Sequence, residues 1–359
     1  MRSRETSGPP ADPKSGATRM HQEAGQSAQV VRDQLKANAA IMAALGATLR
    51  QMQPRAVVTV GRGSSDHAAT FAQYLIETRQ GVIVSSAAPS VSSLYHATPD
   101  MQGVVCLAIS QSGKSPDLLT AIEGAKAAGA FVIALVNDAA SPLAMLADQV
   151  IPLGAGPEVS VAATKSYIAS LSAIVHLVAE WSQDQALLAQ LHALPDRLAD
   201  AWEADWSAAA EVLAPAQNLF VIGRGVGFGV AQEMALKFKE TCGLHAEAFS
   251  AAEVRHGPMA LVGRGFPILA LSQDDQSRAG VDELMAEFID RGAEVLLVGG
   301  SDEAQALAHV RRLPAADADP VLEPILYVQS FYRMVNALAL ARGFDPDRPP
   351  HLNKITETV

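Results

Sequence analysis

Short apolar runs alternate with alanine- and leucine-rich stretches along most of this chain. Continuous apolar strands separated by helices are typical of a parallel sheet that is covered on both faces. The stretches 67–78 and 116–128, which follow two of the apolar runs, have helical residue types. The pattern therefore predicts an α/β fold with a doubly wound parallel sheet flanked by helices. The first five predicted strands cover residues 56–60, 82–84, 103–109, 131–136 and 149–152.

The same landmarks recur in the second half of the chain. Gly61-Arg62-Gly63 is matched by Gly223-Arg224-Gly225, and Ser110-Gln111 is matched by Ser272-Gln273, in both cases 162 residues later (223 − 61 and 272 − 110). Repetition at a fixed spacing indicates a duplicated domain. We expect two copies of one fold, joined by a helical segment at about 164–212. The predicted divisions are a disordered tail at 1–19, a first domain with connecting helices at 20–195, a second domain at 196–343 and a C-terminal tail at 344–359.

One loop of the first copy has the composition of an anion site. A predicted strand ends in Ser110-Gln111-Ser112-Gly113-Lys114-Ser115, and a predicted helix follows. The free amides at a helix N-terminus and the helix dipole favour negative charge, and the serine hydroxyls add donors. A serine-rich turn with a helix cap is an equal alternative for this motif taken alone. The second copy has Asp274 and Asp275 at the matching place, so we expect only the first copy to hold a phosphate.

Nucleotide cofactors are a competing explanation for the glycine-rich turns. The third glycine of a dinucleotide fingerprint would fall at Asp66 in the first copy and at Phe228 in the second, and is absent from both. The sequence has no GxxxxGK[ST] motif, no HExxH motif and no cysteine–histidine cluster. We therefore predict no cofactor and no metal.

The residues suited to proton transfer lie in the second half and at the C-terminus. Lys237 and Glu240 are three apart on a helix predicted at 228–242, and by spacing alone a solvent-exposed salt bridge is favoured. His256 precedes Gly257-Pro258 in a predicted loop, where histidines often serve chemistry. Lys354 follows a proline-rich stretch, and an ordinary surface lysine is its simplest interpretation.

Charge and composition narrow the class of protein further. The net charge is −11, without a basic run, which argues against nucleic-acid binding. The two cysteines, Cys106 and Cys242, form no CxxC pair, which excludes a disulfide scaffold and indicates a reducing cytoplasm. The polar N-terminus has no signal peptide, and no apolar run is long enough to span a membrane. We expect a cytoplasmic protein with no membrane partner.

In combination, these motifs resemble the SIS (sugar isomerase) phosphosugar-binding family. From about residue 20 to the C-terminus, the chain is similar to the isomerase part of glucosamine-6-phosphate synthase and to the stand-alone SIS-type glucosamine-6-phosphate deaminases. The motifs that carry the resemblance are Gly63-Ser64-Ser65, the Ser110 loop, Val161-Ala162-Ala163-Thr164-Lys165, Leu236-Lys237-Phe238-Lys239-Glu240, Glu253-Val254-Arg255-His256-Gly257-Pro258 and Leu352-Asn353-Lys354.

The resemblance implies a role for each candidate residue. Lys354 would form a Schiff base with the open-chain ketose, and Glu240 would move a proton between C1 and C2 beside Lys237. His256 would assist ring opening, often from the partner subunit, which implies a homodimer with a shared active site. The residues implied to bind the sugar phosphate are Ser64, Ser65, Ser110, Gln111, Ser112, Ser115, Val161 and Ala163.

Two departures from the synthase pattern bear on the reaction. That pattern usually has serine at Ala163, which removes one sugar contact, and glycine at Ala252. About 20 polar residues precede the SIS part, which leaves no room for a glutaminase domain. We therefore expect deamination of glucosamine 6-phosphate to fructose 6-phosphate and ammonia. Alternatives are a fructosamine-6-phosphate deglycase, a galactosamine-6-phosphate deaminase-isomerase and a non-catalytic sugar-phosphate sensor.

Overall fold

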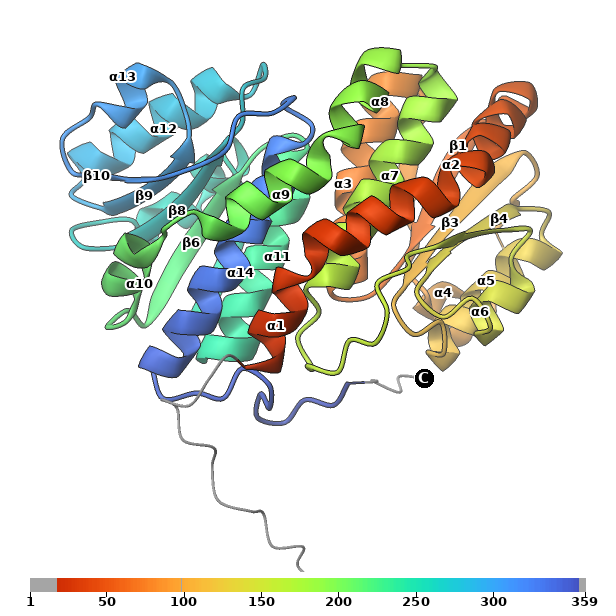
Figure 1. Ribbon diagram of the computed structural model, residues 1–359, viewed down its shortest axis with the longest axis horizontal. Coiled ribbons are helices and arrows are strands. Elements are labelled where there is room, and N and C mark those ends of the chain that lie inside the picture. Colours follow the sequence, from red (N-terminus) through yellow and green to blue (C-terminus); the bar gives the residue numbers. More distant parts are fainter. Residues whose placement is uncertain (1–17, 98, 355–359) are drawn as a thin grey trace, which may run out of the picture.

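The protein has two parallel sheets, one in each half of the chain, with a layer of helices between them (Figure 1). The structure, a computed structural model, describes residues 18–97 and 99–354. The predicted tail at 1–19 lies outside these residues except for its last two. Thr18 caps the first helix, α1 (Arg19–Gly25), and Arg19 begins it.

The two sheets have the same strand order, which confirms the duplicated α/β architecture. The first sheet has the order β2-β1-β3-β4-β5, and the second, read from its β7 edge, has the order β7-β6-β8-β9-β10. All the strand pairs described are parallel. The strands are β1 (Ala56–Val60), β2 (Val84–Ser86), β3 (Val104–Ser110), β4 (Phe131–Val136), β5 (Gln149–Pro152), β6 (Asn218–Gly223), β7 (His245–Ser250), β8 (Pro267–Ser272), β9 (Glu294–Gly299) and β10 (Val310–Leu313).

The second predicted strand, 82–84, is displaced in the structure. Only Val84 belongs to β2, and Ile83 is 70% exposed. The physical reason is that β2 is a short edge strand, which pairs with β1 alone through Val57 and Val84. Backbone hydrogen bonds to β1 define this strand, so its position in the sequence is not marked by a run of apolar residues.

Helices cover the sheets and fill the space between them. The predicted connecting segment at 164–212 is helical and consists of four helices, α7 (Lys165–Ser182), α8 (Gln185–His192), α9 (Leu194–Glu203) and α10 (Ser207–Leu213). The remaining helices are α2 (Ser27–Met52), α3 (Ser64–Gln80), α4 (Ser90–Ser93), α5 (Pro116–Ala127), α6 (Pro142–Leu146), α11 (Gly227–Cys242), α12 (Arg278–Asp290), α13 (Asp302–Gln305) and α14 (Glu323–Ala341), with the 3-10 helices η1 (Glu253–His256) and η2 (Pro258–Leu261).

The contact between α3 and α11 joins the two halves. The largest hydrophobic core cluster contains residues of both sheets and of the helices between them. At Gly229 on α11, a Cβ atom would lie 2.5 Å from the carbonyl oxygen of His67 on α3, so only glycine permits this approach. The close packing brings α11, which belongs to the second half, to the carboxyl edge of the first sheet.

The C-terminal segment returns to the first half of the chain. After α14 it runs along one side of the molecule toward the first sheet (Figure 1). The Asp347 carboxylate accepts hydrogen bonds from the backbone N–H groups of Arg19, at 2.9 Å, and Met20, at 2.8 Å. The segment is therefore tied to the start of α1 a few residues before Lys354.

Candidate active site

A cavity of about 390 Å³ lies at the carboxyl edge of the first sheet. Ligands of open α/β sheets usually bind at this edge, beyond the strand ends. Residues from both halves and from the C-terminal segment line it, and they include all the predicted site residues except His256. The lining residues are Arg62, Ser64, Ser65, Ile109, Ser110, Gln111, Ser112, Ser115, Leu118, Val161, Ala163, Lys237, Glu240 and Lys354.

The Ser110–Ser115 loop forms one end of this cavity. Gly113 has a φ of +64°, a conformation that glycine adopts without strain, and its N–H donates to Ser110 Oγ at 3.0 Å. Ser115 is the N-cap residue of α5, but its side chain makes no capping bond. The interpretation of the motif as a mere helix cap is therefore wrong for Ser115. The loop presents a hydroxyl and a helix N-terminus to the cavity.

Arg62 lines the same end of the cavity, and sequence reasoning missed it. Its guanidinium donates to the buried Asp117 Oδ2 at 2.9 and 3.1 Å. Asp117 lies in the first turn of α5, next to the serine loop. The ion pair fixes a cation beside the predicted phosphate position. The only sequence signal for it was its place in the Gly61-Arg62-Gly63 turn.

Lys237 is buried between two carboxylates, so the solvent-exposed salt bridge favoured by its spacing is wrong. Its side chain is 1% exposed, and Nζ pairs with Glu240 Oε2 and, at 3.4 Å, with Glu233 Oε1. Burial by itself disfavours the ammonium, but Glu233 and Glu240 outweigh it and raise the pKa of Lys237. The reason for the burial is that α11 packs against α3 and α14 rather than facing solvent.

Glu233 organises the floor of this cluster and was not predicted. It lies fully buried on α11 and accepts hydrogen bonds from Ser64 Oγ and Tyr332 OH, both at 3.1 Å. His67 Nδ1 lies 3.1 Å from its other oxygen. Burial opposes its ionisation, but Lys237 and the hydrogen bonds prevail and lower the pKa of Glu233. Its place one helical turn before Lys237 was the only signal in the sequence.

Glu240 is the carboxylate of the cluster that reaches the cavity. Its side chain is 19% exposed and faces the space lined by Ser65 and Lys354. An ion pair with the ammonium of Lys237 holds this carboxylate in place. A carboxylate fixed in this way can remove and return a proton on a bound molecule.

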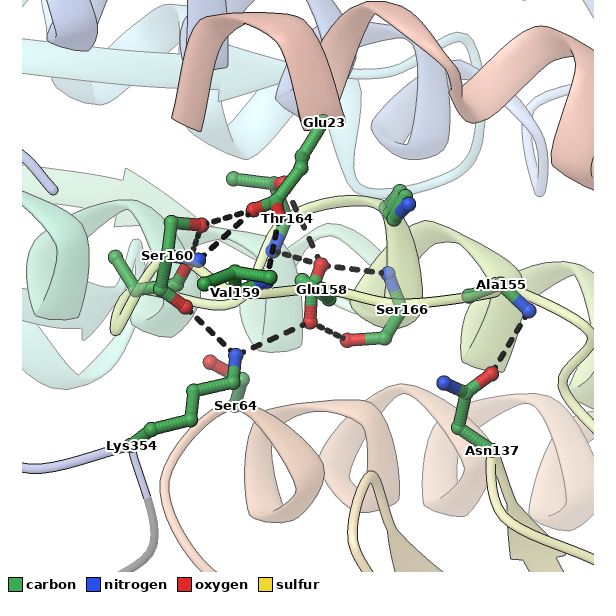
Figure 2. A network of polar contacts seen from close by, with 12 residues as sticks. Glu23, Ser64, Asn137, Ala155, Glu158, Val159, Ser160, Thr164, Ser166 and Lys354 are labelled. Carbon is green, nitrogen blue, oxygen red and sulfur yellow. Dashed lines mark hydrogen bonds and ion pairs between the residues drawn. The ribbon is translucent and has the colours of Figure 1, made fainter. Parts of the chain in front are cut away.

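Lys354 enters the cavity from the C-terminal segment, so its interpretation as an ordinary surface lysine is wrong. Its Nζ donates to the carbonyl oxygen of Ser160 at 2.7 Å and lies 3.6 Å from Glu158 Oε2 (Figure 2). Its side chain remains 27% exposed, which leaves the amine accessible from the cavity. An accessible lysine held at a defined point can act as a nucleophile toward a carbonyl group.

His256 lies outside this cavity. It is the last residue of η1, not a loop residue, and its side chain is exposed. A contribution from the partner subunit, as the resemblance implies, therefore stays a prediction.

The matching edge of the second sheet has a different chemistry. A cavity of about 880 Å³ is lined there by Arg224, Asp274 and Asp275 among others. Asp275 Oδ1 accepts the backbone N–H of Ser277 at 2.7 Å, and Glu323 accepts that of Asp274 at 2.7 Å. Carboxylates of the chain itself therefore occupy donors that a phosphate would need.

The helices and acidic side chains of the described residues also bear on membrane and metal sites. Within residues 18–97 and 99–354, no helix is long and apolar enough to cross a membrane. The same part of the chain contains no group of three or more His, Cys, Asp or Glu side chains arranged to hold a metal ion.

Comparison with known proteins assigns the family. Residues 52–180 and 212–320 each match the model of the SIS domain. The chain belongs to the SIS domain family. The two matched segments correspond to the two sheets, so the predicted architecture of two tandem SIS domains is confirmed.

The relatives of this SIS protein act on sugar phosphates, according to their names. It is 34% identical over 322 residues to glutamine–fructose-6-phosphate aminotransferase [isomerizing] of Aeropyrum pernix, a match covering 84% of this chain and 51% of the relative. The chain thus spans about half the length of this curated relative. A crystal structure described as a candidate phosphosugar isomerase, from Silicibacter pomeroyi DSS-3, has 41% identity and a TM-score of 0.87, covering 92% of this chain and 100% of that one.

The fold, although not the sequence, is also similar to that of a more distant protein. Glucosamine-6-phosphate deaminase from Thermotoga maritima superimposes with a TM-score of 0.75 at 20% identity, covering 95% of this chain and 100% of that one. Together the matches show a SIS protein similar to the isomerase part of the aminotransferases.

Proposed function

We propose that this SIS protein is a glucosamine-6-phosphate deaminase that isomerises its substrate to fructose 6-phosphate and releases ammonia. The observation that carries the proposal is the cavity in which a serine loop, a carboxylate and a lysine amine converge from three distant parts of the chain. Each of the three suits one part of such a substrate: its phosphate, its C1–C2 unit and its carbonyl carbon.

The phosphate is assigned to the Ser110–Ser115 loop. The side chains of Gln111, Ser112 and Ser115 line the cavity beside the N-terminus of α5, and Arg62 adds a fixed positive charge. Helix N-termini and arginines are common partners of phosphate groups. Ser64, Ser65, Val161 and Ala163 would then line the sugar.

The proton transfer is assigned to Glu240. In the open-chain substrate, with an aldehyde at C1 and an amine at C2, Glu240 removes the C2 proton and returns it to C1, while one proton of the amine moves to the C1 oxygen. This step converts the amino aldehyde into the imine of fructose 6-phosphate. Lys237 holds Glu240 in place because its buried ammonium pairs with that carboxylate.

The release of ammonia is assigned to Lys354. Its amine adds to C2 and expels ammonia, which gives a protonated imine between the lysine and the sugar. Water then hydrolyses this imine to the C2 ketone and frees the lysine. We also propose a homodimer in which His256 of the partner subunit assists ring opening.

The state of the two thiols bears on the source of ammonia and so on the direction of the reaction. Both cysteines, Cys106 and Cys242, are buried, and burial raises their pKa values to about 12 and about 11. Neither can supply the thiolate that glutamine hydrolysis requires. With ammonia exchanging with solvent, the proposed reaction runs toward ammonia release at low ammonium concentration.

The test is a substrate panel with ammonia detection. Purified protein should release ammonia from glucosamine 6-phosphate and not from glucosamine, which lacks the phosphate. Galactosamine 6-phosphate and fructosamine 6-phosphate are compared at equal concentration. Faster release from either of these would reassign the substrate. Thermal stabilisation by hexose phosphates without any release would show a sugar-phosphate sensor instead.

A further inference from the structure

A second buried carboxylate lies beside Lys354, on the loop between β5 and α7. The side chain of Glu158 is 0% exposed, and its Oε2 lies 3.6 Å from Lys354 Nζ. Four donors hold it in place: Thr164 N at 3.0 Å, Thr164 Oγ1 at 3.5 Å, Ser166 N at 3.2 Å and Ser166 Oγ at 2.5 Å. Figure 2 shows Glu158 between these donors and the lysine. The carboxylate is therefore fixed with one oxygen toward the amine.

The loop itself is clamped from its other side by Glu23 of α1. The Glu23 carboxylate accepts hydrogen bonds from Val159 N, Ser160 N and Ser160 Oγ. The carbonyl of Ser160 in turn accepts the hydrogen bond of Lys354. Glu23 thus fixes the backbone that holds the lysine but pairs with groups other than its amine (Figure 2). This difference makes it a matched control for Glu158.

Other charged groups near the amine have different partners. Among the described residues, Glu158 is the only carboxylate within 4.0 Å of Lys354 Nζ. Glu240 pairs with Lys237, and Arg62 pairs with Asp117. The buried Lys165, at the start of α7, donates to Gln26 Oε1 at 2.7 Å. Glu158 is therefore the group placed to exchange a proton with Lys354.

We propose that Glu158 accepts the proton of the Lys354 ammonium and returns it to the hydroxyl group that leaves during imine formation. The inference rests on the proposed function, because it requires an imine between Lys354 and the sugar. With fructose 6-phosphate, the ammonium first gives one proton to Glu158, and the free amine adds to the C2 ketone. A second amine proton moves to the C2 oxygen, giving a carbinolamine.

The second half of the step restores the carboxylate. Protonated Glu158 gives its proton to the C2 hydroxyl, which leaves as water while the nitrogen lone pair forms the C=N bond. The net change is one ammonium and one ketone to one protonated imine and one water. The ionised Glu158 then lies beside the positive charge of the imine and stabilises it.

The experiment measures the rate of imine formation in the full chain. Wild-type protein is mixed with saturating fructose 6-phosphate and reduced with borohydride after increasing times, and the mass increase at Lys354 is followed between about pH 6 and pH 9. In Glu158→Gln we expect a rate at neutral pH about 10²-fold lower, the usual size of a general acid–base contribution. The variant's rate should also rise more steeply with pH than that of the wild type, because hydroxide and buffer must then replace Glu158 as the acceptor of the ammonium proton.

Binding and loop structure are controlled separately. Stabilisation by fructose 6-phosphate should remain in Glu158→Gln, because the serine loop is untouched. Glu23→Gln should keep the pH profile of the wild type. If Glu158→Gln does not fold, Ser166→Ala replaces it. Loss of the hydrogen bond that orients Glu158 Oε2 should slow imine formation at neutral pH, and an unchanged rate would overturn the inference.

The two possible failures are distinguishable. No reducible imine in the wild type at any pH would contradict the Schiff-base step of the proposed function. An imine that forms in Glu158→Gln at the wild-type rate, with the wild-type pH profile, would overturn the role of Glu158 and leave the proposed function standing.

Discussion

Lys237 is the residue on which the charge balance of the site depends. It is the buried cation between Glu233 and Glu240. Lys237→Met would leave the buried Glu233 and the partly exposed Glu240 without their shared counter-charge, and we expect a loss of about 3–5 kcal/mol in the free energy of unfolding. Urea unfolding at neutral pH measures it. Lys239→Met, an exposed position on the same helix, is the control and should change stability by less than about 0.5 kcal/mol. An equal, small effect of both substitutions would contradict the buried cluster.

Residues of the cavity differ in how far the sequence predicts them. The serine loop was predicted because a strand end rich in hydroxyls can be read locally, whereas Lys354 was predicted only through the resemblance to the SIS family. Glu158 and Glu233 were not. Each is a buried acid with one partner from a distant segment, Glu158 with Lys354 and Glu233 with Tyr332. No spacing rule along the chain reveals such a pair.

At the scale of elements, the approach of α11 to α3 controls where the proposed base lies. Gly229→Ala would place a methyl group 2.5 Å from His67 O and 2.9 Å from Phe71 N, both on the backbone of α3. The helices must separate, and we expect a loss of about 1–3 kcal/mol in stability and a fall in activity, because Glu240 moves with α11. Thermal unfolding and ammonia release measure the two effects. Gly263→Ala, where a Cβ meets nothing within 4 Å, is the control. Wild-type activity in Gly229→Ala would show that the helix contact does not position the base.

Most strands could be predicted because they are buried apolar runs, as β3 and β4 are along nearly their whole length. The edge strand β2 could not, because its exposed Ile83 neighbours the strand rather than belonging to it. The contact between α3 and α11 also escaped prediction. A small residue such as Gly229 marks a close approach only when the partner helix is known.

At the scale of the whole molecule, the repeat predicted two similar domains. It did not predict which segments of each domain would line the cavity. The duplicated spacing identified both sheets, and Asp274 and Asp275 pointed to the first copy for the phosphate. That α11 and the C-terminal segment complete the first copy's cavity follows only from the three-dimensional packing.

The proposed dimer gives a prediction at this scale. If His256 serves the partner's cavity, His256→Ala and Glu240→Gln homodimers should both be nearly inactive. Randomly mixed subunits should regain about a quarter of wild-type activity, since half the dimers are mixed and each has one intact site. Co-expression with two different tags and purification through both isolates the mixed dimer. Mixed dimers as inactive as either parent would contradict a shared site.

The measurement that tests the central claim most directly is the product ratio from glucosamine 6-phosphate. Ammonia and fructose 6-phosphate are assayed together for the wild type and for Glu240→Gln, which keeps the size of the side chain and removes its charge. We predict equal amounts of both products from the wild type and a loss of at least about 10²-fold in the variant. Full activity of Glu240→Gln, or wild-type protein that releases no ammonia, would contradict the assignment of this cavity as an amino-sugar-phosphate deaminase site.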